Sequence, residues 1–124
     1  MKSYVVFCHP THESFAGAAL QRVLAGLERA GHEVRVTDLY ADGFRPELDE
    51  HDRQVHHVDH RQRPELRPEI AEYVDNLRWC DTIVLVYPTW WAGQPAMLKG
   101  WFDRVWVMGV AWDLPPGTNR IRPL

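Results

Sequence analysis

Two short, almost wholly apolar runs constrain the fold more than any other feature of the sequence: residues 4–8 (YVVFC) and 82–87 (TIVLVY). Both are rich in β-branched and aromatic residues and show no polar–apolar alternation, which is typical of strands buried on both faces. Such strands belong to parallel sheets that are covered by helices on each side. We therefore expect an α/β domain.

The segment after the first run has the spacing of an amphipathic helix. Ser14 is a favourable N-cap, because its hydroxyl can accept a hydrogen bond from a first-turn backbone N–H, and Gly31 suits the left-handed position after the last turn. Residues 33–39 (EVRVTDL) then alternate polar and apolar, which predicts a strand at one edge of the sheet. The apolar face of this helix is predicted to contain Ala19, Val23, Leu24 and Leu27.

Residues 41–67 form a polar excursion that carries four of the seven histidines, and we expect one short helical turn in it near residues 49–54. Loops of this length inside a domain are usually functional or mobile. Pro68 fits the first position of a second helix, and a third helix is predicted over residues 95–106. Strands that alternate with helices predict one α/β domain over residues 1–124, with a parallel sheet and helices on both of its faces.

If the spatial order of the strands is 2-1-3, the pattern of the last strand conflicts with its place in the sheet. Residues 82–87 read as an interior strand, yet the order 2-1-3 leaves them at an edge, with unpaired N–H and C=O groups on a hydrophobic border. Residues 107–124 contain no convincing further strand, since residues 107–112 (VMGVAW) are short and interrupted by glycine. We therefore expect an incomplete fold that is poorly soluble or dimerises through this edge.

Composition excludes several classes of protein. The formal charge of −3 and the lack of a basic stripe argue against a nucleic-acid surface. No stretch approaches the ~20 apolar residues of a membrane span, and the N-terminus lacks the features of a signal peptide. Two cysteines, Cys8 and Cys80, fit a reducing cytoplasm in which buried thiols act as small apolar groups.

Two loops are the candidate ligand-binding segments, because open parallel sheets bind ligands beyond the carboxyl ends of their strands. Residues 9–14 lead into a helix N-terminus, which favours an anion such as phosphate. Residues 88–95 place Trp90 and Trp91 at a strand end, where flat rings could flank a flat heterocycle. The residues alone also allow a plainer interpretation, in which Ser14 only caps the helix, His9 is an ordinary loop histidine, one indole packs on the helix and the other covers the core.

Two motifs then point to one family. Residues 9–15 (HPTHESF) and residues 87–105 (YPTWWAGQPAMLKGWFDRV) resemble the flavodoxin-like NAD(P)H:quinone oxidoreductases, which include quinone reductases, modulators of drug activity and ancillary flavoproteins of potassium efflux systems. The second motif is long and specific. The resemblance implies a flavodoxin-like doubly wound parallel sheet in the strand order 2-1-3, of which the chain would contain about the first two-thirds, with strands 4 and 5 missing.

The resemblance also implies a cofactor and a reaction. A flavin, FAD or FMN, would take a hydride from NAD(P)H and pass it to a quinone-like acceptor, in a cytoplasmic homodimer. No catalytic residue can be named, because the family's reacting groups would lie beyond Leu124. The flavin phosphate would contact His9, Thr11, Ser14, Phe15 and Ala16, the last through its main chain only. The flavin ring would contact Pro88, Thr89, Trp90, Trp91, Ala92 and Gly93, the glycine permitting close approach.

Other interpretations stay open beside this one. Residues 49–60 (DEHDRQVHHVDH) could bind zinc or nickel, although a polar surface loop is the plainer explanation because no recognised ligand spacing is present. Residues 61–67 (RQRPELR) are basic but are flanked by acids, which favours a solvated surface. Lys99 and Asp103 lie one helical turn apart and should pair. The chain could also be a non-enzymatic fragment, or a subunit that regulates a partner such as a transporter.

Overall fold

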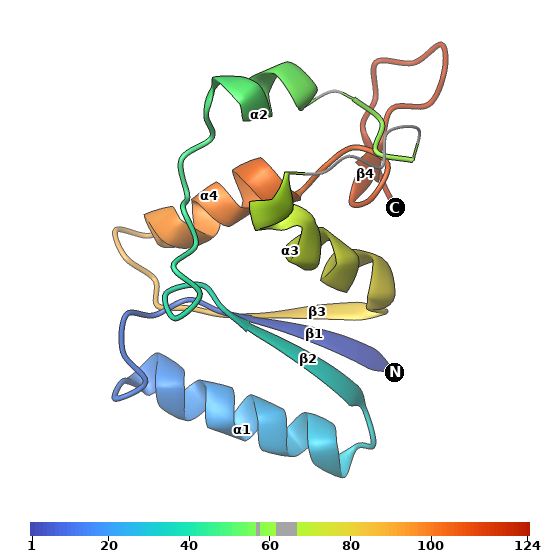
Figure 1. The fold of residues 1–124 in the computed structure, drawn as a ribbon. Helices are drawn as coiled ribbons and strands as arrows, with labels where there is room; N and C mark the ends of the chain where they lie inside the picture. Colours follow the sequence, from blue (N-terminus) through green and yellow to red (C-terminus); the bar gives the residue numbers. More distant parts are fainter. Residues whose placement is uncertain (57, 62–66) are drawn as a thin grey trace.

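The computed structural model describes residues 1–56, 58–61 and 67–124. Figure 1 shows a layered α/β arrangement, with one helix on one face of a parallel sheet and two helices on the other. The sheet contains β1 (Lys2–Phe7), β2 (Glu33–Asp38) and β3 (Thr82–Val86). The helices are α1 (Phe15–Arg29), α2 (Glu50–Val55), α3 (Pro68–Trp79) and α4 (Ala96–Val105).

The strand order is β2-β1-β3, which confirms the order 2-1-3 that the resemblance implies, and both neighbours run parallel to β1, as the alternation of strands and helices predicted. The register aligns Phe7 of β1 with Asp38 of β2 and with Val86 of β3. The three strands therefore end side by side, and the loops that leave β1 and β3 emerge at the same border of the sheet.

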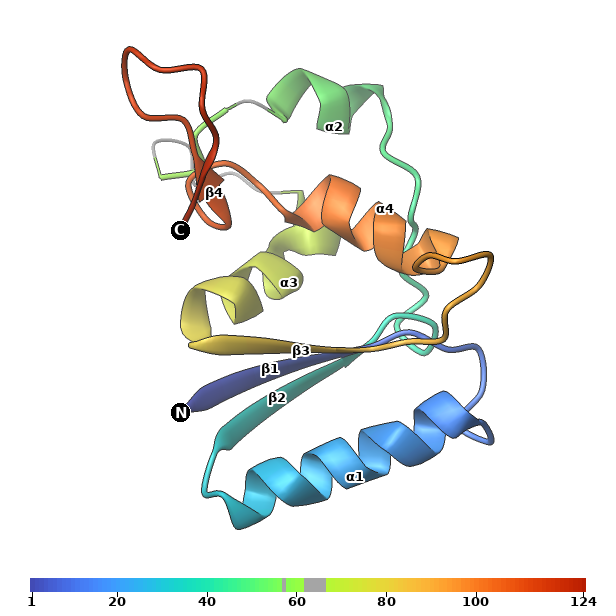
Figure 2. The ribbon, with the colours of Figure 1, turned by 180° about the vertical axis from the view of Figure 1, so that it is seen from behind.

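Each face of the sheet has its own hydrophobic core. α1 packs on one face through the predicted stripe, which lies against Val5, Phe7 and Val86. α3 and α4 cover the other face, where Tyr4 and Trp101 are fully buried. Because side chains of a strand alternate between faces, the continuous apolar sequence of β1 supplies both cores at once. Figure 2 shows the two helical layers from behind, with the sheet between them.

Both predicted caps of α1 are present. The Ser14 hydroxyl accepts a hydrogen bond from the Gly17 N–H at 3.0 Å, and Gly31 has a φ of 73°, in the left-handed region. Pro68 occupies the start of α3 as expected. The short helix expected in the excursion is α2, which begins with a reciprocal capping box between Asp49 and Asp52.

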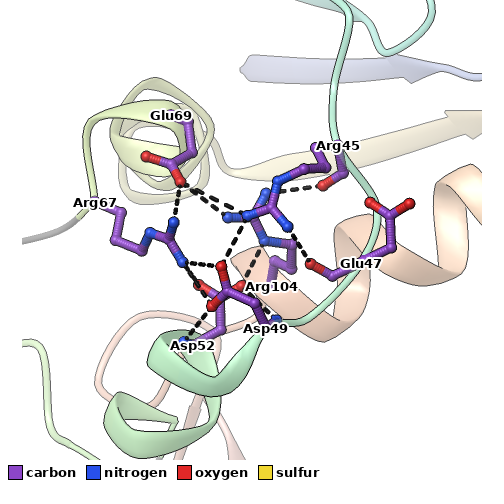
Figure 3. Close-up of polar contacts among 7 residues, drawn as sticks. All are labelled: Arg45, Glu47, Asp49, Asp52, Arg67, Glu69 and Arg104. Atoms are coloured by element: carbon purple, nitrogen blue, oxygen red, sulfur yellow. Dashed lines mark hydrogen bonds and ion pairs between the residues drawn. The ribbon is translucent and has the colours of Figure 1, made fainter.

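A cluster of ionic side chains fastens the excursion to α3 and α4 (Figure 3). Its centre is Arg104, whose side chain has no solvent exposure and whose Nε donates to Asp52 Oδ2 at 2.8 Å. Arg104 also donates to the Arg45 carbonyl at 2.8 Å and to Glu69 at 3.3 Å. We call this cluster the clasp, and its members are Arg45, Asp49, Asp52, Arg67, Glu69 and Arg104.

The ion pairs of the clasp keep its acids charged. The Arg67 guanidinium, with the backbone N–H of Asp52, holds the pKa of Asp49 far below its usual value. Burial opposes ionisation of Asp52, but its hydrogen bonds from Arg104 and from the Asp49 backbone prevail and lower its pKa. A buried charge that is paired in this way is strongly destabilising if its partner is removed.

The C-terminal segment folds apart from the main sheet. β4 (Trp112–Asp113) and β5 (Arg122–Pro123) form a two-residue antiparallel pair with each other. The expectation that residues 107–124 add no strand to the sheet is therefore confirmed, although the segment is not wholly without strands. In the parts of the chain that the structure describes, β3 pairs with β1 alone. None of the described helices is both long and apolar enough to cross a bilayer.

Candidate functional site

The two predicted loops meet at the carboxyl border of the sheet. The loop after β1 leads into α1, and the loop after β3 leads into α4 (Figure 1). The rings of His9 and Trp90, one from each loop, lie 6.0 Å apart between centroids. The fold therefore brings together residues that are about eighty positions apart in the sequence.

The first loop is held by its own hydrogen bonds. The Ser14 hydroxyl donates to the Thr11 carbonyl at 2.9 Å while it accepts from Gly17. The Thr11 hydroxyl accepts from the Glu13 N–H at 3.1 Å, and Nδ1 of His9 lies 3.0 Å from the Thr11 N–H. The hydroxyl proton of Ser14 is thus already in use within the loop. Nε2 of His9, by contrast, makes no hydrogen bond within the described residues.

The first turn of α1 offers backbone donors. The N–H groups of Phe15 and Ala16 have no acceptor among the described residues, as expected at the start of a helix. This turn contains no acidic residue, so the positive end of the helix dipole is not offset there. Ala16 is buried against the sheet while Phe15 is 92% exposed, so Ala16 can contribute only its main chain.

The second loop forms a tight turn with unusual backbone angles. Trp90 and Gly93 exchange backbone hydrogen bonds of 3.0 and 3.2 Å. Between them, Trp91 and Ala92 have φ values of 52° and 61°, the left-handed region that non-glycine residues seldom occupy. Such strain is often retained at functional sites. Gly93 itself does not adopt a positive φ, and a Cβ there would meet open space.

The indoles of this turn face solvent. Trp91 is fully exposed and Trp90 is 44% exposed, which contradicts the plainer interpretation that one indole packs on the helix and the other covers the core. Thr89 and Ala92 are exposed and Pro88 is half-buried. The turn thus presents flat aromatic surface and backbone groups next to a helix start that favours an anion. A planar heterocycle with a phosphate tail has the chemistry to match both halves.

Two close contacts of the first loop were not foreseen, whereas the burial of Cys8 beside it was. Nε2 of His12 lies 2.6 Å from Asp38 Oδ2, which ties the first loop to the end of β2. Gly17 lies so close to this loop that a Cβ there would stand 1.9 Å from the His12 carbonyl oxygen. Cys8, which ends the apolar run of β1, is buried, and burial raises the pKa of its thiol to about 11. That thiol is therefore unreactive, as expected of an apolar filler.

The remaining candidates lie away from this border. Among the described residues no group of histidines, cysteines and carboxylates could hold a metal ion; His57 and residues 62–66 lie outside the described part of the chain. Of the basic cluster, Arg61 pairs with Asp59 and Asp113, and Arg67 belongs to the clasp. Lys99 and Asp103 pair as predicted.

Comparisons with known proteins agree with this geometry. Residues 1–122 match the protein family described as having a flavodoxin-like fold. The chain is 37% identical to a ribosyldihydronicotinamide dehydrogenase-like protein, traD, of Penicillium crustosum, over 92% of this chain and 47% of that protein. It is 32% identical to human ribosyldihydronicotinamide dehydrogenase [quinone], over 92% of this chain and 54% of that protein. The chain thus spans about half the length of these relatives.

A solved structure of a similar protein has the same fold. The NAD(P)H:quinone oxidoreductase from Methanothermobacter marburgensis superposes with a TM-score of 0.82 at 36% identity, over 92% of this chain and 57% of that one.

Proposed function

This chain belongs to the family with the flavodoxin-like fold, and from that premise we propose that it is the flavin-binding part of an NAD(P)H-dependent oxidoreductase. The proposed acceptors are quinones or similar electrophiles. We further propose that the flavin is FMN or FAD, that the protein forms a homodimer and that it is located in the cytoplasm. The observation that carries it is the pairing, at one border of the sheet, of exposed indoles with an anion-favouring helix start.

The residues present fit a flavin. The unpartnered N–H groups of Phe15 and Ala16 and the half-buried imidazole of His9 are suitable donors for a phosphate. Thr11 keeps a hydroxyl proton that is not used within the loop. Ser14 takes part by holding the loop and capping the helix, and it could donate to a phosphate only by giving up its bond to Thr11.

The second loop would hold the ring. The indole of Trp91 offers a face for stacking, and the ring of Trp90 lies next to that of His9. The backbone from Pro88 to Gly93 can hydrogen-bond a polar ring edge. Because Trp91 and Ala92 sit in a hydrogen-bonded turn, their positions are set before a ligand arrives, which lowers the entropic cost of binding. The flavin, when bound, supplies the chemistry of hydride transfer; this chain orients the ring and limits its access to water.

The proposal is tested with the purified chain. We expect it to bind FMN or FAD, with a shift in the flavin absorption spectrum, and to oxidise NAD(P)H when a quinone is present. Trp91→Ala should weaken flavin binding about 3- to 10-fold, because aromatic contacts of this kind are worth ~0.5–1.5 kcal/mol. The matched control is Ile121→Ala, which removes an exposed apolar side chain from the C-terminal segment.

Two results would contradict the proposal. A chain that ignores both flavins would favour a non-enzymatic role, such as regulation of a partner protein. A flavin that binds equally well to the Trp91 and Ile121 variants would place the cofactor somewhere other than this turn. If flavin binds but NAD(P)H is not oxidised, the result would support the proposed binding site and contradict the proposed reaction.

A further inference from the structure

A second histidine of the first loop, His12, joins that loop to another strand. Its Nε2 lies 2.6 Å from Asp38 Oδ2 at the end of β2, and because a carboxylate can only accept, this nitrogen carries the proton of the hydrogen bond. Among the hydrogen bonds of the described residues, this is the one that links residues 9–14 to a part of the chain beyond β1 and α1. The other hydrogen bonds of the loop hold it to itself and to the helix that follows.

Asp38 is a fixed anchor for this bond. It pairs with Phe7 in the register of the sheet, and its other carboxylate oxygen accepts a hydrogen bond from the Ala41 N–H at 3.1 Å. The side chain of Asp38 is 18% exposed, whereas that of His12 is 58% exposed. The imidazole therefore reaches from a loop at the surface to a carboxylate whose position is set by the sheet.

Further contacts of His12 fix the loop on two other elements. The rings of His12 and Phe7 lie 4.8 Å apart between centroids, within the range that is favourable for aromatic pairs. The His12 carbonyl lies against Gly17 at the start of α1 and accepts a hydrogen bond from the Ser14 N–H at 2.9 Å. His12 thus contacts β1, β2 and α1 at once.

We propose that His12 is a positioning residue for the flavin phosphate, an inference that rests on the flavin site proposed above. Through its bond to Asp38, His12 fixes the loop beside the N–H groups of Phe15 and Ala16, so that the loop and the helix start form one preformed site. Fixing the backbone of a single residue costs about as much free energy as a tenfold change in affinity. A loop that is already fixed does not incur that cost when a phosphate binds.

A different role for His12 is direct attraction of the phosphate by a protonated imidazole. The contact with Asp38 argues against this role, because Nε2 is already bonded to a carboxylate whose negative charge offsets that of an imidazolium. The two roles predict different behaviour in a variant that keeps a hydrogen-bond donor but cannot carry a charge. Glutamine is such a residue, since its amide nitrogen can take the place of Nε2.

The test compares riboflavin, which has no phosphate, with FMN and FAD, each titrated into the full chain and followed by flavin fluorescence. In the unaltered chain, FMN or FAD should bind more tightly than riboflavin. His12→Ala should weaken binding of the phosphorylated flavin about 5- to 10-fold and leave that of riboflavin unchanged. His12→Gln should keep the affinities of the unaltered chain, and circular dichroism checks that the variants fold.

The matched control for these substitutions is His51→Ala. His51 is an exposed histidine of α2 and makes no hydrogen bond or ion pair among the described residues. Its removal should leave the affinities for all three flavins unchanged. A weakening of FMN or FAD binding in this variant as large as in His12→Ala would contradict a specific role for His12.

Asp38→Ala provides the reciprocal test. If Asp38 only repelled the phosphate, its removal would strengthen binding of FMN or FAD; loss of the anchor should instead weaken it about 5- to 10-fold, as in His12→Ala. Substituting both residues should cost no more affinity than either substitution alone, because the two act through one bond. Tighter binding of the phosphorylated flavin to the Asp38 variant, or additive losses in the double variant, would overturn the proposal.

A measurement without flavin reports on the loop itself. The Ser14 and Gly17 amides are hydrogen-bonded within the loop and the first turn of its helix. They should exchange with solvent faster in His12→Ala than in the unaltered chain or in His12→Gln. Equal exchange in all three proteins would refute the tether, and so would a loss of FMN or FAD affinity in His12→Gln as large as in His12→Ala.

These results separate the role of His12 from the flavin site. If the unaltered chain prefers FMN or FAD to riboflavin and His12→Ala keeps that preference in full, the flavin site is supported and the role of His12 is wrong. If the unaltered chain binds riboflavin as tightly as FMN and FAD, the phosphate is not held by this loop and the role of His12 is wrong as well. A chain that binds none of the three contradicts the flavin site and, with it, this role.

Discussion

Replacing Gly17 with alanine tests how closely the first loop is held against the start of α1. An added Cβ at this position would stand 1.9 Å from the His12 carbonyl oxygen and 2.7 Å from its carbonyl carbon. Both atoms belong to the backbone, so no side-chain rotation can relieve the contact. The loop from His9 to Ser14 must move, or the first turn of the helix must.

The size of the effect follows from two opposing contributions. Alanine is favoured over glycine in a helix by ~1 kcal/mol. Forcing extra atoms into a packed position costs ~1–3 kcal/mol, and sometimes more. At a separation of 1.9 Å from a backbone atom the second contribution should lie in the upper part of its range, and we expect the free energy of unfolding to fall by about 1–2 kcal/mol.

Gly26 provides the matched control in the same helix. A Cβ at Gly26 would meet nothing within 4 Å, so Gly26→Ala should raise the free energy of unfolding by ~0.5–1 kcal/mol. Urea unfolding followed by circular dichroism measures both changes. The flavin affinity should fall for the Gly17 variant alone, because only that substitution displaces the loop. A Gly17 variant as stable as the Gly26 variant would refute the close packing on which the site is built.

Three further predictions concern the helix cap and the clasp. Ser14→Ala should lower the free energy of unfolding by ~1 kcal/mol, since it removes the acceptor for the Gly17 N–H; an unchanged urea midpoint would count against the cap. Arg104→Met should cost ~3–5 kcal/mol, because Asp52 would stay buried without its main partner, and adding Asp52→Asn should recover part of that loss in a double-mutant cycle; full additivity would refute the coupling. The pKa values of Asp49, Asp52 and Glu69 are lowered in the folded state, so their stabilisation is present above the unfolded values and is lost as pH falls below about 4. The urea midpoint should accordingly be lower at pH 3 than at pH 7, and equal midpoints would contradict this.

The sequence was sufficient for features that depend on neighbouring residues. The apolar runs of β1 and β3 and the alternation of β2 report burial directly, because side chains alternate between the faces of a strand. Ser14, Gly31 and Pro68 mark helix ends for reasons of local hydrogen bonding and backbone geometry. The strand order came from the family that the two motifs resemble, and the meeting of the two loops followed from that order.

Features that depend on distant residues were not predictable in this way. Arg104 and Asp52 are 52 residues apart and His12 and Asp38 are 26 apart; no local pattern pairs them. The left-handed angles of Trp91 and Ala92 also escaped prediction, since such turns usually contain glycine or asparagine. The sequence directs attention to Gly93, whereas the strain lies in the two residues before it.

The central claim is that a flavin lies at the carboxyl border of the sheet, between the helix start and the tandem indoles. Amide and indole chemical shifts recorded by NMR during titration with FMN, and separately with FAD, test it most directly. We predict that the largest changes fall on the indole N–H groups of Trp90 and Trp91 and on the amides of residues 14–17. Saturable changes confined to another part of the chain, such as the hollow lined by Leu77, Asp81 and Ile83, would contradict the claim. The absence of any change with either flavin would contradict it as well.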